Sequence, residues 1–238
     1  MAQSWSIIVL CYNEEGSLSS VLNELSKTLS DKMKVDDYEI IVVNDGSTDN
    51  SKSKILEISK DIPQIILKEH KTNLGIGQAI RTGFFAATKE NVMAMAGDGQ
   101  FNIPDLIPHA NIDADTMVSF YRVDKGPYTA FRHFISNFNK WLIEYCLGAK
   151  IKDVNWVKIY KKQNLDSIKL ELKSSLIETE IVTKLMRNSI KLNEFQTVYL
   201  PRLYGEPKGA SFKVVSMALL ELIKLIFILR IRRLVLGR

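Results

Sequence analysis

Short apolar runs alternate with segments of amphipathic spacing through the first half of the chain. The apolar runs are typical of buried parallel strands, and they predict strands at 6–11, 38–43, 65–68, 92–96 and 116–121. Between them, apolar residues at every third or fourth position predict helices over 18–29, 49–58 and 75–87. Strands that alternate with helices form a parallel sheet with right-handed crossovers. We therefore expect an α/β fold with a mostly parallel sheet flanked by helices.

The pattern changes after residue 121. Aromatic residues at helical spacing between Phe131 and Tyr145 predict a helix that belongs to the core. Later strands are predicted at 158–161 and 196–200, with a helix over 177–186 between them and a loop over 201–209. A strongly apolar helix over 214–236 closes the chain. We therefore expect one domain over residues 1–209 and a C-terminal helix over 210–238.

The charge of the chain is unevenly distributed. The 238 residues carry a net charge of +5, but residues 208–238 hold seven basic residues and one acidic residue. This end alone contributes +6 and leaves the rest of the chain at −1. A nucleic-acid-binding protein more often spreads its basic residues over a folded face, so we expect no nucleic acid partner. The basic end is instead typical of a segment directed to a membrane surface.

The two cysteines and three histidines are too scattered to predict a disulfide framework or a zinc site. Cys11 and Cys146 lie far apart in apolar surroundings, which favours a reducing compartment. The first residues do not show a basic segment followed by an apolar one, so we expect no secretory signal.

Two of the predicted strands end in acidic turns. The strand at 38–43 leads into Asn44-Asp45-Gly46-Ser47, and the strand at 92–96 leads into Gly97-Asp98-Gly99-Gln100. The carboxyl ends of parallel strands meet at one edge of the sheet, where open α/β folds bind nucleotides. Two carboxylates at this edge suit a site that binds a nucleotide-sugar at both of its ends. Taken alone, Asn-Asp-Gly-Ser is also simply a favourable turn sequence, and that interpretation stays open.

A third motif follows the first strand. The aromatic face of Tyr12 can stack on a nucleobase, and the carboxylate of Glu14 can accept hydrogen bonds from a base or a ribose. Residues 73–79 invite a dinucleotide-binding interpretation, but Ile80 stands where the third glycine of that fingerprint belongs. A tight helix start that lets the backbone approach a ligand is the better interpretation.

Read in order, these motifs match a known family. The stretches are IIVLCYNEEGSL, EIIVVNDGSTDNS, NLGIGQAIRTG, GDGQFNIPDL and EFQTVYLPRLYGEPKG. The chain resembles the family-2 glycosyltransferases of the GT-A fold, and within them the dolichol-phosphate mannose synthase and polyprenyl-phosphate glycosyltransferase branch. The resemblance runs from about residue 6 to residue 209. It implies a Rossmann-like GT-A sheet and an enzyme that takes a sugar from a UDP- or GDP-sugar.

The resemblance also implies roles for individual residues. It assigns the nucleotide to Tyr12, Glu14, Asp45 and Gly97, and the metal and diphosphate to Asp98 and Gln100. Arg122, Arg132, Arg202 and Lys208 would face the phosphates of donor or acceptor, with Arg202 and Lys208 on the acceptor phosphate. Asp153 and Glu180 match acidic positions on the sugar side of the pocket. The implied catalytic set is Asp98, Arg122, Arg132, Asp153, Glu180 and Arg202, and the implied cofactor is Mg²⁺ or Mn²⁺.

The chain departs from the family pattern at two places. The family usually carries Asp-x-Asp, whereas this chain has Ala96-Gly97-Asp98. Mg²⁺ and Mn²⁺ often need only one or two carboxylates in addition to substrate phosphates, so Asp98 with Gln100 still suits a metal, held more weakly. The stretch 153–157 lacks the small residues usual there, and we expect Trp156 to narrow the sugar pocket.

Three functions stay open at this point: charging a dolichyl or undecaprenyl phosphate with one sugar, extending a lipid-linked glycan or polysaccharide, and binding a nucleotide-sugar without turnover. A lipid phosphate is already an anion near neutral pH, because its second pKa is about 6, and it needs no general base. A hydroxyl acceptor would need a carboxylate base, for which Asp153 and Glu180 are the candidates. The Arg-x-x-Gly-x-x-Lys pattern of residues 202–208 favours the first function, and Ala96 favours the third.

The C-terminal helix is expected to lie on a membrane rather than to cross it. Crossing a bilayer takes about 20 apolar residues, and Glu221, Lys224 and Arg230 interrupt this helix. Lys213, Glu221 and Lys224 fall on a narrow polar arc, as in an interfacial helix, although a helix that packs back on the domain or pairs with a partner chain is the alternative. The aromatic stripe of residues 131–145 is a candidate for a prenyl groove. We expect a peripheral protein on the cytoplasmic face of the cell membrane, with a membrane protein or a second copy as a further partner.

Overall fold

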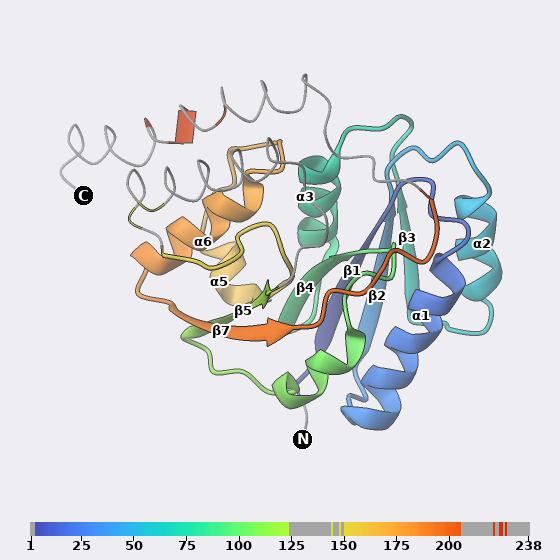
Figure 1. Ribbon diagram of the computed structural model, residues 1–238, viewed down its shortest axis with the longest axis horizontal. Helices are drawn as coiled ribbons and strands as arrows, with labels where there is room; N and C mark the ends of the chain where they lie inside the picture. The colour runs from blue at the N-terminus through green and yellow to red at the C-terminus, as the bar shows by residue number, and fades with distance from the viewer. Residues whose placement is uncertain are drawn as a thin grey trace.

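A seven-stranded mixed sheet forms the centre of the computed structural model, which describes residues 3–123, 144, 148, 150–205, 221, 224, 225 and 227 (Figure 1). The order of its strands is β3-β2-β1-β4-β6-β5-β7. The bounds are β1 Trp5–Cys11, β2 Tyr38–Asn44, β3 Ile65–Glu69, β4 Asn91–Ala96, β5 Thr116–Arg122, β6 Lys158–Lys161 and β7 Lys191–Thr197.

The register of the parallel strands brings three loops to one edge of the sheet. Cys11 at the end of β1 lies opposite Asn44 at the end of β2, and Leu10 lies opposite Ala96 at the end of β4. The loops that follow β1, β2 and β4 therefore begin at the same level. β6 is antiparallel to both β4 and β5, whereas β5 and β7 are parallel, so the sheet is mostly parallel, as predicted.

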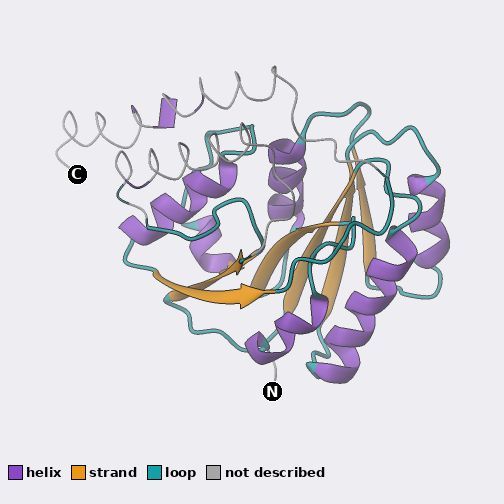
Figure 2. Ribbon diagram, viewed as in Figure 1, coloured by secondary structure: helices purple, strands orange, loops and turns teal. Residues whose placement is uncertain are grey.

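Helices cover both faces of the sheet (Figure 2). One face packs against α1 Leu18–Lys27, α2 Ser51–Ile58 and the 3₁₀ helix Ile103–His109, and the other against α3 Ile76–Ala86, α5 Lys162–Asp166 and α6 Ile177–Arg187. Because successive side chains of a strand point to opposite faces, Ile7 and Val9 of β1 join the first layer, and Ile8 joins the second. Buried apolar side chains on both faces explain why the central strands are continuous apolar runs.

The predicted elements are confirmed over most of the described chain, with one clear error. The strand predicted at 196–200 is wrong, because β7 begins at Lys191 and ends at Thr197. β7 pairs with β5 and carries mostly exposed or half-buried side chains, so it gives no apolar run to recognise. Two short helices, 103–109 and 162–166, are absent from the prediction, and the helix predicted to 29 changes at Thr28 into a π-helical turn over Thr28–Lys32.

Of the three helices predicted after residue 121, those over 131–145 and 214–236 fall largely outside the described residues. Of the stretch 131–145, only Glu144 is described. In the predicted C-terminal helix, Glu221, Lys224 and Leu225 are helical, and Leu225 is fully buried. Within the part of the chain that the structure describes, no helix has the length and apolar character needed to cross a membrane.

Candidate active site

Side chains from the β2 loop hold the loop that follows β1. The backbone N–H of Asn13 donates to Ser47 Oγ at 3.0 Å, and the N–H of Glu14 donates to Ser51 Oγ at 2.9 Å. Asn13 itself has a φ of 54°, a left-handed conformation that asparagine tolerates well. These bonds fix the two predicted nucleotide-binding positions of this loop, Tyr12 and Glu14, at the carboxyl edge of the sheet.

Asp45 is buried at the end of β2, where it anchors the loop that leads into α3. Its carboxylate accepts the N–H groups of Leu74 and Gly75 at 2.9 and 2.8 Å, and His70 Nδ1 lies 2.6 Å from Oδ1. The other ring nitrogen of His70 lies 2.8 Å from Thr82 Oγ1 on α3. The sequence suggested no role for His70, since a single histidine in a loop carries no signal of its own.

Arg202 joins two of the predicted site carboxylates. Its Nη1 lies 2.8 Å from Glu14 Oε1, and its Nη2 lies 2.9 Å from Asp98 Oδ2. Both carboxylates are buried, and the Arg202 side chain is 19% exposed. Charge-assisted contacts of this kind are strong and directional, so one guanidinium fixes the spacing of Glu14 and Asp98.

Segment 199–203 brings Arg202 to this position because it runs along the loop after β4. The N–H of Leu203 donates to the carbonyl of Asp98 at 3.1 Å, and the N–H of Leu200 donates to the carbonyl of Gln100 at 3.0 Å. The side-chain amide of Gln100 donates to the Tyr199 hydroxyl at 2.6 Å. The two predicted metal positions, Asp98 and Gln100, are therefore held by a segment about a hundred residues further along the chain.

A second arginine lies next to the ring of Tyr199. Arg122, at the end of β5, makes a bidentate contact with Asp153, with Nε at 2.8 Å and Nη2 at 3.2 Å from the two carboxylate oxygens. Its guanidinium carbon lies 4.1 Å from the ring centroid of Trp156 and 5.3 Å from that of Tyr199. Stacking on aromatic faces and a bidentate carboxylate together hold the guanidinium in one orientation.

A buried lysine supports the loop that carries Asp153 and Trp156. The ammonium of Lys158 donates to the carbonyls of Val154 and Trp156 at 2.6 and 2.8 Å, and lies 3.4 Å from Glu178 Oε2. The Tyr160 hydroxyl donates to the same carboxylate at 2.5 Å. Burial, with the charge of Glu178, raises the pKa of Tyr160 well above its ordinary value, so Tyr160 stays a hydrogen-bond donor.

Glu180 makes its contacts with a different set of residues from those described above. It is fully buried on α6 and accepts the N–H groups of Glu171 and Leu172, at 2.9 Å each, and the ammonium of Lys184 at 2.6 Å. Its carboxylate therefore holds a loop, a role that the sequence did not suggest. Gly97 is buried, and its carbonyl accepts the Ser17 hydroxyl at 2.7 Å. The predicted site residues Arg132 and Lys208 lie outside the described residues.

The candidate metal position offers oxygen ligands. Among the described residues, no cluster of three or more histidine, cysteine, aspartate or glutamate side chains could hold a metal ion. Asp98 is the carboxylate predicted for the metal, and its Oδ1 accepts the N–H of Gln100 at 3.1 Å. One carboxylate, together with phosphate oxygens and water, suits Mg²⁺ or Mn²⁺, which prefer oxygen and often keep few protein ligands.

Cys11 should react slowly with thiol reagents in the folded protein. Burial raises the pKa of its thiol, against the weaker lowering effect of Ser51 and Ser47, so the thiol stays protonated and shielded. In a Cys146→Ser background, Ellman's reagent at pH 8 should modify Cys11 at least about tenfold more slowly before unfolding than after it in urea. The pKa of Cys11 is higher in the folded state than in the unfolded state, where it is about 8.5. The contribution of Cys11 to the free energy of unfolding should therefore be constant below this pH and fall above it, because the unfolded state then releases the proton more readily. Equal rates before and after unfolding would contradict the burial of Cys11.

Comparison with known proteins places this chain in a family. The family model described as "Glycosyl transferase family 2" matches residues 6–168, more than half of the chain. A dolichyl-phosphate beta-glucosyltransferase of Trichomonas vaginalis is 27% identical over 89% of this chain and 69% of its own length. An undecaprenyl-phosphate 4-deoxy-4-formamido-L-arabinose transferase of Proteus mirabilis is also 27% identical, over 89% of this chain and 64% of its own length.

Solved structures share the fold at lower identity. Glucosyl-3-phosphoglycerate synthase from Mycobacterium tuberculosis, in complex with UDP, has a TM-score of 0.66 at 17% identity, with 94% of this chain and 80% of that chain covered. The mannosyltransferase PcManGT from Pyrobaculum calidifontis, in complex with GDP-Man and Mn²⁺, has a TM-score of 0.61 at 18% identity, with 84% and 58% covered. Both are glycosyltransferases of the GT-A fold. With its ordered motifs gathered at the carboxyl edge of this sheet, the chain belongs to glycosyl transferase family 2.

Proposed function

We propose that the chain is an inverting glycosyltransferase that moves one sugar from a UDP- or GDP-sugar to a polyprenyl phosphate. The observation that carries the proposal is the arginine framework of the site, in which Arg202 links Glu14 to Asp98 and Arg122 is clamped by Asp153. The names of the two relatives above, a dolichyl-phosphate and an undecaprenyl-phosphate transferase, support the class of acceptor. The chain spans about two thirds of the length of those relatives.

The donor is proposed to bind across the ends of β1, β2 and β4. Tyr12, Glu14 and Asp45 would contact the nucleoside, and Gly97 would let the backbone approach the nucleotide. Asp98 and Gln100 would hold Mg²⁺ or Mn²⁺ at the diphosphate. The ion, when bound, supplies positive charge that stabilises the departing nucleoside diphosphate.

The acceptor phosphate is proposed to attack without a general base. Its oxygen is already anionic at neutral pH, so the protein has to position it and offset the repulsion between two phosphates. Arg202 and Arg122, with Arg132 and Lys208, would supply that charge, and attack from the face opposite the diphosphate inverts the anomeric centre. The environment of Asp153 and Glu180, the two candidate general bases, supports a phosphate acceptor over a hydroxyl acceptor. Asp153 is held by Arg122, and Glu180 is held by its loop and Lys184.

The chain is proposed to sit peripherally on the cytoplasmic face of the cell membrane, through its basic C-terminal segment. Glu221, Lys224 and Leu225 lie on one side of that helix, against the domain, because residues three and four apart share a face. Phe227, in the same segment, is 58% exposed, which suits insertion among lipid headgroups. A membrane protein or a second copy of the chain stays the predicted further partner.

Phe227→Glu should weaken binding to vesicles that contain anionic lipid. An exposed aromatic residue at the headgroup level favours the interface, and a carboxylate there is repelled by anionic lipid. In a flotation assay, we expect the bound fraction of the full-length variant to fall about threefold or more. Leu56→Glu is the matched control, because Leu56 is also exposed, at 48%, but lies on α2. Equal flotation of the Phe227 variant and the wild type would exclude this contact.

The proposed activity can be tested directly with a panel of labelled donors. The wild-type chain is incubated with UDP- and GDP-sugars, Mn²⁺, and undecaprenyl or dolichyl phosphate, and the organic phase is counted. We expect one donor to label the lipid. Label on a water-soluble or lipid-linked glycan alone would favour glycan extension, and nucleotide binding without any transfer would favour a binding subunit.

Ala96→Asp should lower the Mn²⁺ concentration needed for half-maximal transfer. Ala96 ends β4 and is exposed, so an aspartate there would add a second carboxylate at the sheet edge, two residues before Asp98. A second oxygen ligand of this kind should reduce the half-saturating Mn²⁺ concentration by about five- to tenfold. Ala114→Asp, on the exposed loop before β5, is the control for added charge. An unchanged Mn²⁺ requirement would place the metal away from Ala96.

A further inference from the structure

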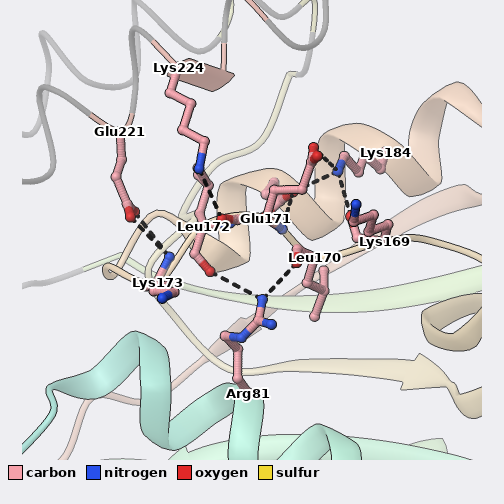
Figure 3. Close-up of polar contacts among 10 residues, drawn as sticks. Arg81, Lys169, Leu170, Glu171, Leu172, Lys173, Lys184, Glu221 and Lys224 are labelled. Carbon is pink, nitrogen blue, oxygen red and sulfur yellow. Dashed lines mark hydrogen bonds and ion pairs between the residues drawn. The ribbon is translucent and has the colours of Figure 1, made fainter.

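The loop between α5 and α6 is held by charged side chains from three separate segments, as Figure 3 shows. From α6, Glu180 accepts the N–H groups of residues 171 and 172, and Lys184 donates to the carbonyl of Lys169 at 2.6 Å. From α3, Arg81 Nη1 donates to the carbonyl of Leu170 at 2.7 Å and that of Leu172 at 3.4 Å. We refer to residues 169–174 as the bracing loop.

The third segment contains Glu221 and Lys224, two helical residues of the predicted C-terminal helix. The Glu221 carboxylate accepts the N–H of Lys173 at 3.1 and 3.2 Å (Figure 3). It also accepts the N–H of Ser174 at 2.9 Å. Lys224 donates to the carbonyl of Glu171 at 3.3 Å. Glu221 is thus the group that fixes the last two backbone N–H groups of the bracing loop.

The backbone of residues 173 and 174 packs closely against the first turn of α3. A Cβ atom added at Gly77 would lie 2.1 Å from the Ser174 carbonyl oxygen and 2.3 Å from that of Lys173, so only glycine fits there. The peptide unit between Lys173 and Ser174 is planar, with its N–H and its carbonyl on opposite sides. Its N–H faces Glu221 and its carbonyl faces Gly77. A single rigid unit therefore connects the C-terminal helix with α3.

The first turn of α3 in turn positions Asp45. The N–H groups of Leu74 and Gly75, directly before the helix, are the backbone donors to its carboxylate. Gly75 also accepts the N–H groups of Gln78 and Ala79, so it belongs to the hydrogen-bonded start of α3. A shift of the helix start would move both donors to Asp45.

We propose that Glu221 is a positioning residue of the nucleotide site. Through the bracing loop it holds the first turn of α3, and thereby the two N–H groups that fix Asp45. This inference rests on the proposed function, in which Asp45 contacts the nucleoside. It makes docking of the C-terminal helix on the domain a condition for tight binding of the donor.

The test compares nucleotide binding by full-length variants, measured by calorimetry with UDP and GDP. Glu221→Ala should raise the dissociation constant of the preferred nucleotide about five- to tenfold, because the N–H groups of the bracing loop lose their acceptor. Glu221→Gln, which keeps one acceptor oxygen, should raise it only about two- to threefold, and it serves in place of the alanine variant if that one does not fold. At saturating donor, kcat should change by less than about twofold, since Glu221 touches no reacting group.

A second variant tests the route of the effect. Gly77→Ala should also weaken nucleotide binding, because its methyl group displaces the Lys173–Ser174 peptide. Combined with Glu221→Ala, the two effects should be clearly less than additive, since both act through one peptide unit. Glu57→Ala, which removes a 67% exposed carboxylate on α2, is the control for lost charge.

Two results would overturn the inference. One is a dissociation constant of Glu221→Ala within twofold of that of the wild type, even if its melting temperature falls. The other is full additivity with Gly77→Ala. A wild-type chain that binds neither nucleotide would contradict the proposed function itself, and the inference with it.

Discussion

Asp98→Ala should reduce sugar transfer about a thousandfold or more while the chain stays folded. Asp98 is the carboxylate after β4 that Arg202 contacts, and with Gln100 it is proposed to hold the metal. Its loss would remove the carboxylate that holds both the ion and the Arg202 guanidinium, and the loss of one such electrostatic contact commonly costs a factor of about 10²–10³. The measurement is the initial rate of lipid labelling at saturating donor and Mn²⁺.

Asp98→Asn separates the charge of this residue from its role in the loop. Asparagine keeps an oxygen that can accept the N–H of Gln100, so the β4 loop should keep its shape. We expect the asparagine variant to be nearly as inactive as the alanine variant, because the negative charge is what the arginine and the ion require. Asp113→Ala, on an exposed loop, is the control. Activity of Asp98→Ala within tenfold of the wild type would remove Asp98 from the catalytic set.

The second large effect is on stability. Lys158→Met should lower the free energy of unfolding by about 3–5 kcal/mol, because it leaves the Glu178 carboxylate, which is only 12% exposed, without its ion-pair partner. The Lys158 side chain is fully buried, and its ammonium also satisfies the carbonyls of Val154 and Trp156, which would lose their donor. Urea unfolding, followed by tryptophan fluorescence, gives the free energy for each variant.

A second substitution should recover part of this loss. Adding Glu178→Leu removes the unpaired carboxylate and leaves an apolar pair in its place, which is often tolerated where a single replacement is not. The double variant should therefore be more stable than Lys158→Met alone, although the Tyr160 hydroxyl then lacks its acceptor. A cost below about 1 kcal/mol for Lys158→Met would show that the 154–156 loop does not depend on this lysine.

The sequence predicts the central part of the fold because the apolar runs of the central strands match their burial on both faces of the sheet. β1, β2 and β4 are apolar on both faces and end at motifs with a recognisable turn chemistry, so these strands and the loops that follow them can be located from the sequence. β7 could not be placed in this way. It is mostly exposed, and its partner β5 lies about seventy residues earlier in the chain, so only tertiary pairing defines its register.

The supporting residues of the site are the part that the sequence could not predict. His70 and Lys158 hold Asp45 and the 154–156 loop, but neither belongs to a local motif. Tyr199, which accepts a hydrogen bond from Gln100, lies within one of the family motifs, but the motif does not reveal this contact. Lysine in a short strand looks like a solvated residue, and only the fold reveals that Lys158 is buried. Glu180 differs from these residues, because the sequence did single it out, for the sugar side of the pocket. In the structure its carboxylate accepts backbone N–H groups of the loop before α6, a contact that the sequence did not suggest.

The ion pair between Glu14 and Arg202 has a consequence for how the protein is made, because 188 positions separate the two residues. While the chain emerges from the ribosome, β1, β2 and β4 are available long before Arg202 appears. A nascent chain of that length lacks the arginine that bridges Glu14 and Asp98. The spacing of these two carboxylates is therefore fixed only after the segment that carries Arg202 has been synthesised.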